Sequence, residues 1–370
     1  MKKKRVLVAM SGGVDSSVAA ALLVEQGFEV IGATMQVWDY SQCDIVEGAG
    51  TCCSSIDVDD ARSVADKLDI PFYVLNCEAK FKATVIDPFI QSYLNAQTPL
   101  PCVNCNTFLK FDHLIVKMKE LGCDYLATGH YAQVLKNDRG ESVIATSTDD
   151  WKDQTYFLFT IDPSIVDKLM FPIGHLNKPQ VRQIAEMKGL TVAKKKDSTG
   201  ICFVGSQGYD QFIASQVDQK ILNTKKGVFK RYPSGEILAE HAGIHLYTIG
   251  QSKGLGMTYH EKLFVIKIEA GSNVVWLGEE KDLYQSAVDV VDCHWLNHVE
   301  NGEMVQAKIR YQHKPSPAKI VKTEFGFRLE FLEPQRAVTP GQAAVIYKNS
   351  GSLDSSSYEK ILVGGGWIRT

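Results

Sequence analysis

A glycine-rich turn near the start of the chain combines residue types that bind anions. It lies between an apolar strand-like run and an apolar helix-like run, and it comprises Ala9, Met10, Ser11, Gly12, Gly13, Val14, Asp15 and Ser16. Two adjacent glycines let the backbone fold close to a ligand. The amides of such a turn, with the helix N-terminus behind it, bind phosphate. Ser11 and Ser16 add hydroxyl donors, and Asp15 is suited to begin the helix or to bind Mg²⁺.

The spacing of this turn excludes two common nucleotide-binding signatures. No lysine follows the glycines, so the turn is not G-x-x-x-x-G-K-[ST], and it is not G-x-G-x-x-G either. Ser-Gly-Gly-x-Asp-Ser directly after the first strand resembles instead the pyrophosphatase (PP) loop of enzymes that split ATP into AMP and pyrophosphate. The alternative is a glycine-rich strand-to-helix turn that holds no ligand.

Three cysteines have surroundings that suit a reactive thiol. Cys102 and Cys105 form a C-x-x-C at a helix start, where the helix dipole lowers a thiol pKa. Three interpretations compete: a redox disulfide, half of a zinc site, and a reactive thiol whose partner lies elsewhere. A four-cysteine zinc site needs a second C-x-x-C, which the sequence lacks, and Cys202 in a glycine-containing loop is the remaining candidate. The alternative is that all three are small buried core residues.

The elements expected in the first half of the chain would bring these residues together. Strand-like segments at 6–8, 30–35, 72–75 and 125–127 alternate with helix-like segments at 57–68, 81–93 and 111–121, and a further helix is expected at 179–188. This rhythm predicts an α/β fold with a doubly wound parallel sheet, in which ligands bind beyond the carboxyl ends of the strands. The PP-loop, Met35 and Thr128-Gly129-His130 all follow strands. A Met at a strand end is, however, more often part of the core.

The helical periodicity fades after about Gly208. Short strand-like segments, separated by turns rich in Gly, Asn or Pro, occupy 263–268, 274–277, 305–311, 319–321 and 343–347. This pattern is typical of small antiparallel barrels. We therefore expect a catalytic PP-loop domain at 1–208, a small β-rich central domain at 209–275 and a C-terminal antiparallel β-barrel at 276–370.

Composition places the chain among ordinary globular proteins. Hydrophobic residues make up 45% and charged residues 22%, and the apolar runs are far shorter than a membrane span. The basic start 1–5 is followed by too short an apolar run for an export signal, so we expect a cytoplasmic protein with no membrane partner. Nine cysteines then indicate reduced thiols. With a net charge of −3, any nucleic-acid contact must come from local basic patches.

Five motifs occur in the order seen in the bacterial tRNA-uridine 2-sulfurtransferases, also called tRNA 2-thiouridylases. They occupy 11–16, 127–131, 152–154, 197–203 and 338–342, and the chain resembles this family nearly from end to end. The resemblance implies ATP-dependent replacement of O2 by sulfur in the wobble uridine (U34) of the tRNA anticodon loop. ATP and Mg²⁺ would adenylate the oxygen, a poor leaving group, and a thiolate or persulfide would supply the sulfur.

The same resemblance implies roles for individual residues. Cys202 matches the residue that receives sulfur as a persulfide, and Cys105 matches the nucleophile that attacks this persulfide and can form a disulfide with it. Nucleotide contacts are implied for residues 9–16, Met35 and Gly129. Leu100, Pro101 and Cys102 match the segment that faces the target base. Contacts with tRNA are implied for His130, Lys152, Asp153, Gln154, Arg310, Tyr311 and Gln342.

One departure from the family pattern leaves two mechanisms open. Many members carry Asp where this chain has Cys102, and that Asp is a proposed acid or base. Cys102, Cys105 and Cys202 together offer three thiolates, as in related tRNA thiolases that hold a [4Fe–4S] cluster with one open iron. The sulfur would come either from a persulfide relay or from cluster-bound sulfide. The donor would be a protein of a persulfide relay or a cysteine desulfurase.

Two other functions fit parts of the sequence. An ATP pyrophosphatase that activates a small acid for amidation would use the same loop but needs neither Cys105 nor Cys202. A non-catalytic RNA-binding protein with a vestigial nucleotide fold would bind tRNA without ATP turnover. Basic and aromatic clusters such as 308–311 fit any RNA-binding protein, since phosphate contacts give affinity without sequence preference. Chemistry on a base in a folded loop also requires flipping it out, so we expect a deep pocket near Cys105.

Overall fold

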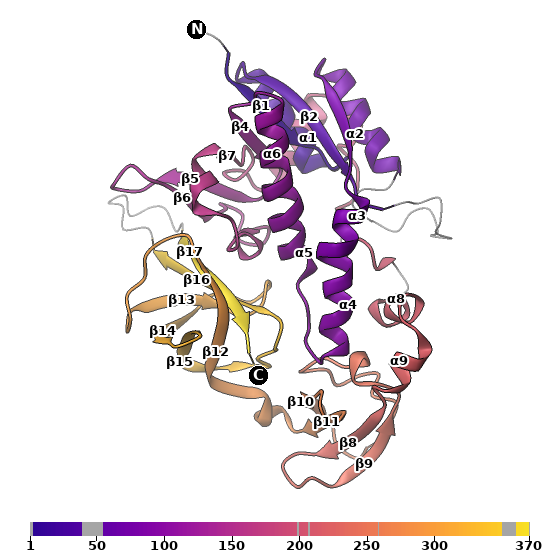
Figure 1. The fold of residues 1–370 in the computed structure, drawn as a ribbon. Helices are drawn as coiled ribbons and strands as arrows, with labels where there is room; N and C mark the ends of the chain where they lie inside the picture. The colour runs from indigo at the N-terminus through magenta and orange to yellow at the C-terminus, as the bar shows by residue number, and fades with distance from the viewer. Residues whose placement is uncertain are drawn as a thin grey trace.

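The computed structural model describes residues 3–38, 55–197, 200–205, 208–257, 259–349 and 360–369. Figure 1 shows an α/β domain at the N-terminus, a small sheet and a β-barrel that contains the C-terminal strands. In the described ranges, no helix combines the length and the apolar character needed to cross a membrane. The expected fold class is confirmed in all three of its parts.

The first sheet has five parallel strands. In spatial order they are β3 (Phe72–Asn76), β2 (Glu29–Gln36), β1 (Arg5–Ala9), β4 (Tyr125–Thr128) and β7 (Leu169–Met170). Successive residues of β1 point to opposite faces: Leu7 belongs to one core cluster, and Val6 and Val8 belong to another. Both faces of the sheet are therefore covered, as a doubly wound sheet requires.

Helices cover the two faces in separate groups. The face of Val6 packs against α1 (Val14–Glu25), α2 (Ser55–Lys67) and α7 (Lys178–Met187). The face of Leu7 packs against two longer helical runs. The first consists of α3 (Glu78–Phe81), a π-helical stretch (Lys82–Ile86) and α4 (Asp87–Leu94), and the second of α5 (Pro101–Asn104), a π-helical stretch (Cys105–His113) and α6 (Leu114–Glu120). The second run begins ten residues earlier than the expected helix at 111–121, so the C-x-x-C lies inside it.

A hairpin in the first half of the chain joins a different sheet. β5 (Ala132–Lys136) and β6 (Ser142–Thr146) pair with each other, and β6 pairs with the last strand of the barrel. Figure 1 shows this hairpin beside the barrel. The aromatic run after Gln154 forms a short 3₁₀ helix, Thr155–Phe157, and is followed by a second one, Pro163–Lys168.

The central domain begins with helices and contains a parallel strand pair. After α8 (Tyr209–Gln216) and α9 (Gln219–Asn223), the sheet order is β10 (Phe264–Glu269), β11 (Val274–Gly278), β8 (Gly227–Arg231) and β9 (Ile237–His241). β11 and β8 are parallel, so this small β-rich domain has a mixed sheet. The expected boundary between residues 275 and 276 falls inside β11, which pairs within the central sheet up to Gly278.

Six antiparallel strands close the C-terminal barrel around one apolar core. They are β12 (Tyr284–Trp295), β13 (Met304–Lys308), β14 (Ser316–Thr323), β15 (Gly326–Arg336), β16 (Ala343–Asn349) and β17 (Lys360–Ile368). Pairing of β12 with β17 closes the circle. Because β13 ends at Lys308, Arg310 and Tyr311 lie beyond the strand that was expected to contain them.

Candidate active site

The PP-loop is held between α2 and the end of β4 at distances that require glycine. Gly12 has φ +70°, and a Cβ there would lie 2.1 Å from the carbonyl oxygen of Asp57. Gly129 follows β4, and a Cβ on it would lie 2.5 Å from the amide nitrogen of Ser16. Two residues far apart in sequence, Gly12 and Gly129, thus need the absence of a side chain for one turn to form.

Serine hydroxyl groups fix the shape of the turn. The amide of Ser11 donates to Oγ of Ser16 at 3.1 Å, and Oγ of Ser16 donates to the carbonyl of Gly13 at 3.2 Å. Oγ of Ser17 donates to the same carbonyl at 2.8 Å. With the turn held in this way, the first amides of α1, which have no acceptor within the helix, lie at the carboxyl end of β1. This is a preorganised anion site.

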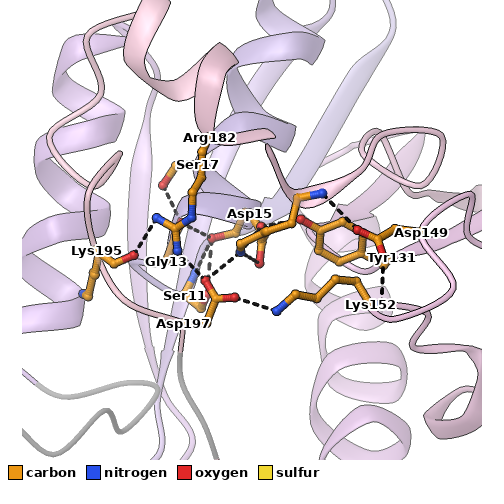
Figure 2. A network of polar contacts seen from close by, with 12 residues as sticks. Ser11, Gly13, Asp15, Ser17, Tyr131, Asp149, Lys152, Arg182, Lys195 and Asp197 are labelled. Atoms are coloured by element: carbon orange, nitrogen blue, oxygen red, sulfur yellow. Dashed lines mark hydrogen bonds and ion pairs between the residues drawn. The ribbon is translucent and has the colours of Figure 1, made fainter. Parts of the chain in front are cut away.

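Asp15 at the start of α1 is surrounded by donors. Nζ of Lys178 contacts its two carboxylate oxygens at 2.8 and 2.9 Å, and the hydroxyl of Tyr131 donates to it at 2.9 Å. Burial, and then the negative charge of Asp15, raise the pKa of Tyr131, so the phenol keeps the proton that it donates. Figure 2 shows Asp15 and Tyr131 facing each other from opposite sides of the site.

A second carboxylate, Asp197, gathers three cations beside the loop. It contacts Lys152 at 2.7 Å, Lys178 at 2.9 Å and Arg182 at 2.7 Å, and Figure 2 shows Lys152 and Arg182 approaching it from different elements. Partial burial alone would raise the pKa of Asp197, but the hydrogen bonds from Lys152 and Lys178 outweigh burial and lower this pKa to about 2. Asp197 is therefore ionised at neutral pH.

Lys195, the middle residue of the three-lysine run 194–196, contacts both the PP-loop and α2. Nζ of Lys195 forms ion pairs with Asp57 and Asp60 of α2 and donates to the carbonyl of Gly12 at 3.1 Å. Lys195 therefore ties the PP-loop to α2, and its charge is balanced by two carboxylates.

Cys105 and Cys202 pack against the same side of the parallel sheet. Both contact the core cluster that contains Leu7, and both are partly buried. Their neighbours in sequence touch one helical run, since Nδ2 of Asn104 donates to the carbonyl of Thr84 and the ring of Phe203 lies 5.7 Å from that of Phe81. Cys105 begins a π-helical stretch, a feature that often occurs at functional sites.

Three residues of the implied tRNA set are buried or bonded to the backbone of the site. His130 is 6% exposed, and its Nδ1 lies 2.7 Å from Oγ1 of Thr128. Burial lowers the pKa of His130 well below its ordinary value, so the ring is neutral. Asp153 is 5% exposed and accepts from the amide of Ser147 at 3.0 Å, and Gln154 accepts from the amide of Tyr131 at 3.0 Å. In this conformation these side chains support the site, whereas Lys152 remains partly exposed.

The implied tRNA residues of the barrel lie where the barrel meets the catalytic domain. Nε2 of Gln342 donates to the carbonyl of Thr98 at 2.9 Å, two residues before Leu100. The ring of Tyr311 lies 4.5 Å from that of Phe157. Burial first, and then the negative charge of Asp153, raise the pKa of Tyr311 to about 12.

Arg310 has a structural set of acceptors. Its Nη2 donates to the carbonyl of Ala337 at 2.7 Å and to Oγ1 of Thr339 at 2.8 Å. A longer contact of 3.4 Å reaches the carbonyl of Ile249 in the central domain. Arg310 thus joins the barrel to the central domain.

The structure does not assemble the metal site that three cysteines suggested. In the described part of the chain, no group of three or more His, Cys, Asp or Glu side chains is arranged to hold a metal ion. Cys102, Cys105 and Cys202 therefore do not form a preassembled site for a single metal ion. A Mg²⁺ ion bound with a triphosphate needs only one or two carboxylates, so Asp15 remains a suitable ligand.

The structure also describes a cavity and the surroundings of Met35. A cavity of about 530 Å³ lies in the central domain, beside Tyr259 and Leu277, and the deep pocket expected near Cys105 stays a prediction. Met35 is 8% exposed and belongs to the core cluster of Leu7, so its side chain packs in the core.

Sequence reasoning missed the cations of α7. Lys178 and Arg182 are four residues apart, on one face of this helix, which begins at the N-cap Asn177. The sequence shows this spacing, but a lysine and an arginine on a surface helix usually face solvent, so the spacing alone does not indicate a site. What marks them is the proximity of Asp15 and Asp197, which only the fold brings about.

Comparisons with known proteins cover all three domains. A family model described as tRNA methyl transferase HUP domain matches residues 4–206. Models described as tRNA methyl transferase PRC-barrel domain and aminomethyltransferase beta-barrel domain match residues 215–279 and 285–368.

Full-length relatives carry one name. The tRNA-specific 2-thiouridylase MnmA of Clostridium botulinum is 44% identical over 375 residues, which cover 100% of this chain and 98% of that protein. The protein of the same name from Acetivibrio thermocellus is 44% identical over 373 residues and covers 100% of both chains.

Solved structures resemble the chain only distantly. A 4-thiouridine synthetase–RNA complex with bound ATP has a TM-score of 0.33 and 15% identity over 58% of this chain and 50% of that one. The NMN synthetase of Francisella tularensis has a TM-score of 0.31 and 16% identity over 60% of this chain and 81% of that one. Scores this low establish no functional relationship, whereas the full-length identity of 44% does. The chain belongs to the tRNA-specific 2-thiouridylase family.

Proposed function

We propose that this protein catalyses ATP-dependent 2-thiolation of the wobble uridine in the tRNA anticodon loop. The observation that carries the proposal is the combination of a preorganised anion site in the PP-loop with Cys105 and Cys202 on one side of the same sheet. The names of the full-length relatives agree with this chemistry. An amidating ATP pyrophosphatase would use the loop but would have no need of the two thiols.

The first step activates the uracil. O2 of the base attacks the α-phosphorus of ATP, and the bond from this phosphorus to the bridging oxygen breaks. Pyrophosphate leaves with the electron pair, AMP becomes bonded to O2, and the N3 proton is released. The loop amides, and Mg²⁺ held by Asp15, would stabilise the charge on the phosphates.

The second step delivers sulfur. The thiolate of Cys105 attacks Sγ of the Cys202 persulfide, which forms the Cys105–Cys202 disulfide and releases hydrosulfide. Hydrosulfide adds to C2, AMP leaves with the C2–O2 electron pair, and the proton returns to N3, which gives 2-thiouridine. A thiol reductant must supply two electrons to open the disulfide, and a persulfide donor, either a relay protein or a cysteine desulfurase, must reload Cys202.

The persulfide relay is preferred to cluster-bound sulfide. The relay needs two thiols that can meet, and the sequence neighbours of Cys105 and Cys202, Asn104 and Phe203, contact one helical run. A cluster needs three thiolates near one another, and among the described residues no group of three metal-ligating side chains is arranged to hold a metal ion.

Methyl transfer is the second candidate, because two of the matched family models are described as tRNA methyl transferases. Methyl transfer gives no role to two cysteines beside a pyrophosphatase-type loop. The two reactions also leave different products, since one replaces an oxygen of the base and the other adds a carbon.

Nucleoside analysis tests the proposal. Purified protein, ATP, Mg²⁺ and unmodified tRNA are incubated with a cysteine desulfurase, cysteine and a thiol reductant, and the digested tRNA is analysed by mass spectrometry. We expect 2-thiouridine at the wobble position, formed only when ATP is present, together with AMP and pyrophosphate. A methylated nucleoside, or ATP cleavage without any change in the tRNA, would contradict the proposal.

A further inference from the structure

Three cations and two carboxylates meet beside the PP-loop, and the proposed chemistry has so far used only one of these groups, Asp15. Lys178 contacts both Asp15 and Asp197, and Arg182, one helical turn later, contacts Asp197. Lys152 completes the set from the turn that precedes the 3₁₀ helix. The side chain of Lys178 is 11% exposed, so its charge sits largely out of water, and the two carboxylates compensate it.

The arrangement around Asp197 is the one that a phosphate group would have. Lys152, Lys178 and Arg182 converge on one carboxylate from the turn at 149–152 and from α7. A phosphate offers the same kind of acceptor oxygens with more negative charge, and Arg and Lys are its usual partners. Lys178 also holds Asp15 of the PP-loop, so the set adjoins the site for the triphosphate.

We propose that Asp197 takes the place of a phosphate group when no nucleotide is bound. In that state Asp197 pairs with Lys152, Lys178 and Arg182, and when ATP binds these cations pair with its pyrophosphate portion instead. The inference rests on the proposed function, because it assigns these cations to the leaving group of the adenylation step. Asp197 then competes with pyrophosphate for the same three partners. The return of Asp197 to these cations would favour pyrophosphate release after each turnover.

Binding of Mg²⁺-pyrophosphate, measured by isothermal titration calorimetry without tRNA or sulfur donor, tests this competition. Asp197→Asn removes the competing charge, so we expect pyrophosphate to bind roughly tenfold more tightly, the size of one charge-assisted hydrogen bond. Lys178→Met and Arg182→Met should each weaken binding by roughly tenfold for the same reason. Lys188→Met is the matched control: Lys188 caps the same helix and pairs with Glu25 at 2.9 Å, so binding should not change.

The opposite result for Asp197→Asn would overturn the proposal. If Asp197 serves only to position the cations, its replacement will leave pyrophosphate binding equal or weaker. A structure of the wild-type protein with bound pyrophosphate also tests whether pyrophosphate replaces Asp197 as the partner of the cations. Loss of the 2.9 Å contact between Asp197 and Lys178 supports the exchange, and retention of all three cation contacts excludes it. If pyrophosphate binding changes as predicted but the protein does not thiolate tRNA, the pyrophosphate site is supported and the proposed function is contradicted.

Discussion

Gly129 illustrates how a single missing side chain positions the nucleotide site. The residue after β4 touches the first turn of α1, and a Cβ there would lie 2.5 Å from the amide nitrogen of Ser16 and 2.8 Å from its Cα. Both atoms are backbone and cannot rotate away. The start of α1 would therefore have to move, and with it the amides that form the anion site.

Gly129→Ala should abolish most nucleotide binding. We expect ATP affinity to fall by at least about tenfold, and the free energy of unfolding to fall by about 1–3 kcal/mol, as for overpacked positions. Calorimetry with ATP and urea denaturation measure the two effects. Gly271→Ala is the control, because a Cβ at Gly271 would meet no atom within 4 Å. Equal ATP affinity of Gly129→Ala and wild type would show that the loop tolerates displacement of α1.

The two relay cysteines should affect only the second half of the reaction. In Cys105→Ser and Cys202→Ser we expect 2-thiouridine formation to stop, while ATP-dependent release of pyrophosphate continues, because neither thiol takes part in adenylation. Cys293→Ser in the barrel is the control, since Cys293 packs against the barrel core. Parallel assays of pyrophosphate and 2-thiouridine check this outcome. Loss of pyrophosphate release in both relay variants would contradict the prediction that neither thiol takes part in adenylation.

Cys102→Ala separates the relay from the cluster mechanism. The relay requires two thiols, so we expect this variant to keep sulfur transfer within a few-fold of wild type. Anaerobically purified protein should also lack the broad visible absorption of a [4Fe–4S] cluster. Absorption that disappears in Cys102→Ala together with activity would reinstate the cluster.

The phosphate-site residues that could be predicted share local signals. Adjacent glycines after an apolar strand were sufficient for the PP-loop, and β1 and α1 confirm that context. Lys178, Arg182 and the pairing of Asp197 with cations were not recognised, because they depend on the ion pairs Lys178–Asp15 and Arg182–Asp197, which no local pattern encodes. For His130 the sequence motif was recognised, but the burial of the side chain could not be predicted from it.

At the scale of elements, the segment before α5 depends on the barrel. Nε2 of Gln342 donates to the carbonyl of Thr98, and the amide of Thr98 donates to the carbonyl of Pro340. These contacts fix the chain just before Leu100, Pro101 and Cys102, although Gln342 and Thr98 are 244 residues apart.

Gln342→Ala should slow thiolation without weakening nucleotide binding. The variant removes the side-chain donor, so we expect a several-fold lower rate of 2-thiouridine formation and faster amide exchange around residues 98–102. Gln335→Ala is the matched control, because Nε2 of Gln335 donates to the carbonyl of Glu333, only two residues away in the same strand. Unchanged exchange in Gln342→Ala would mean that backbone contacts alone hold the segment.

Elements that are marked by a local sequence pattern were predicted, whereas elements that depend on contacts between distant segments were not. Strands with a continuous apolar run, such as β2 and β16, were predicted nearly to their ends. Three strands, β12, β15 and β17, alternate between apolar and polar residues or contain glycines, and they pair with segments elsewhere in the chain. No local pattern therefore predicted them. β11 was seen, but the parallel pairing with β8 that assigns it to the central sheet was not.

At the scale of the whole molecule, histidine burial should set the acid limit of stability. Burial is the first cause of a lowered pKa for five of the nine histidines: His113, His130, His241, His245 and His313. As the pH falls below 6.5, the ordinary value, the unfolded chain binds protons that the folded chain does not. Folding stability is therefore full above that pH and declines as the pH falls toward the lowered values.

Urea denaturation between about pH 7.5 and about pH 5 checks this slope, which approaches about 1.4 kcal/mol per pH unit for each histidine that takes up its proton only on unfolding. His245→Gln should make the slope shallower, since Nδ1 of His245 is buried without a hydrogen-bond partner in the described structure. His260→Gln on an exposed turn serves for comparison. A flat stability curve across this range would refute the argument.

The β5–β6 hairpin has a consequence for how the protein is made. Its outer partner is β17, whose residue Ile361 pairs with Ala145 more than two hundred positions earlier. A ribosome releases the hairpin long before that partner exists, so the nascent chain carries an open strand edge through most of its synthesis. A fragment that stops after the first domain keeps this edge permanently, and it should self-associate unless a separately supplied barrel caps it.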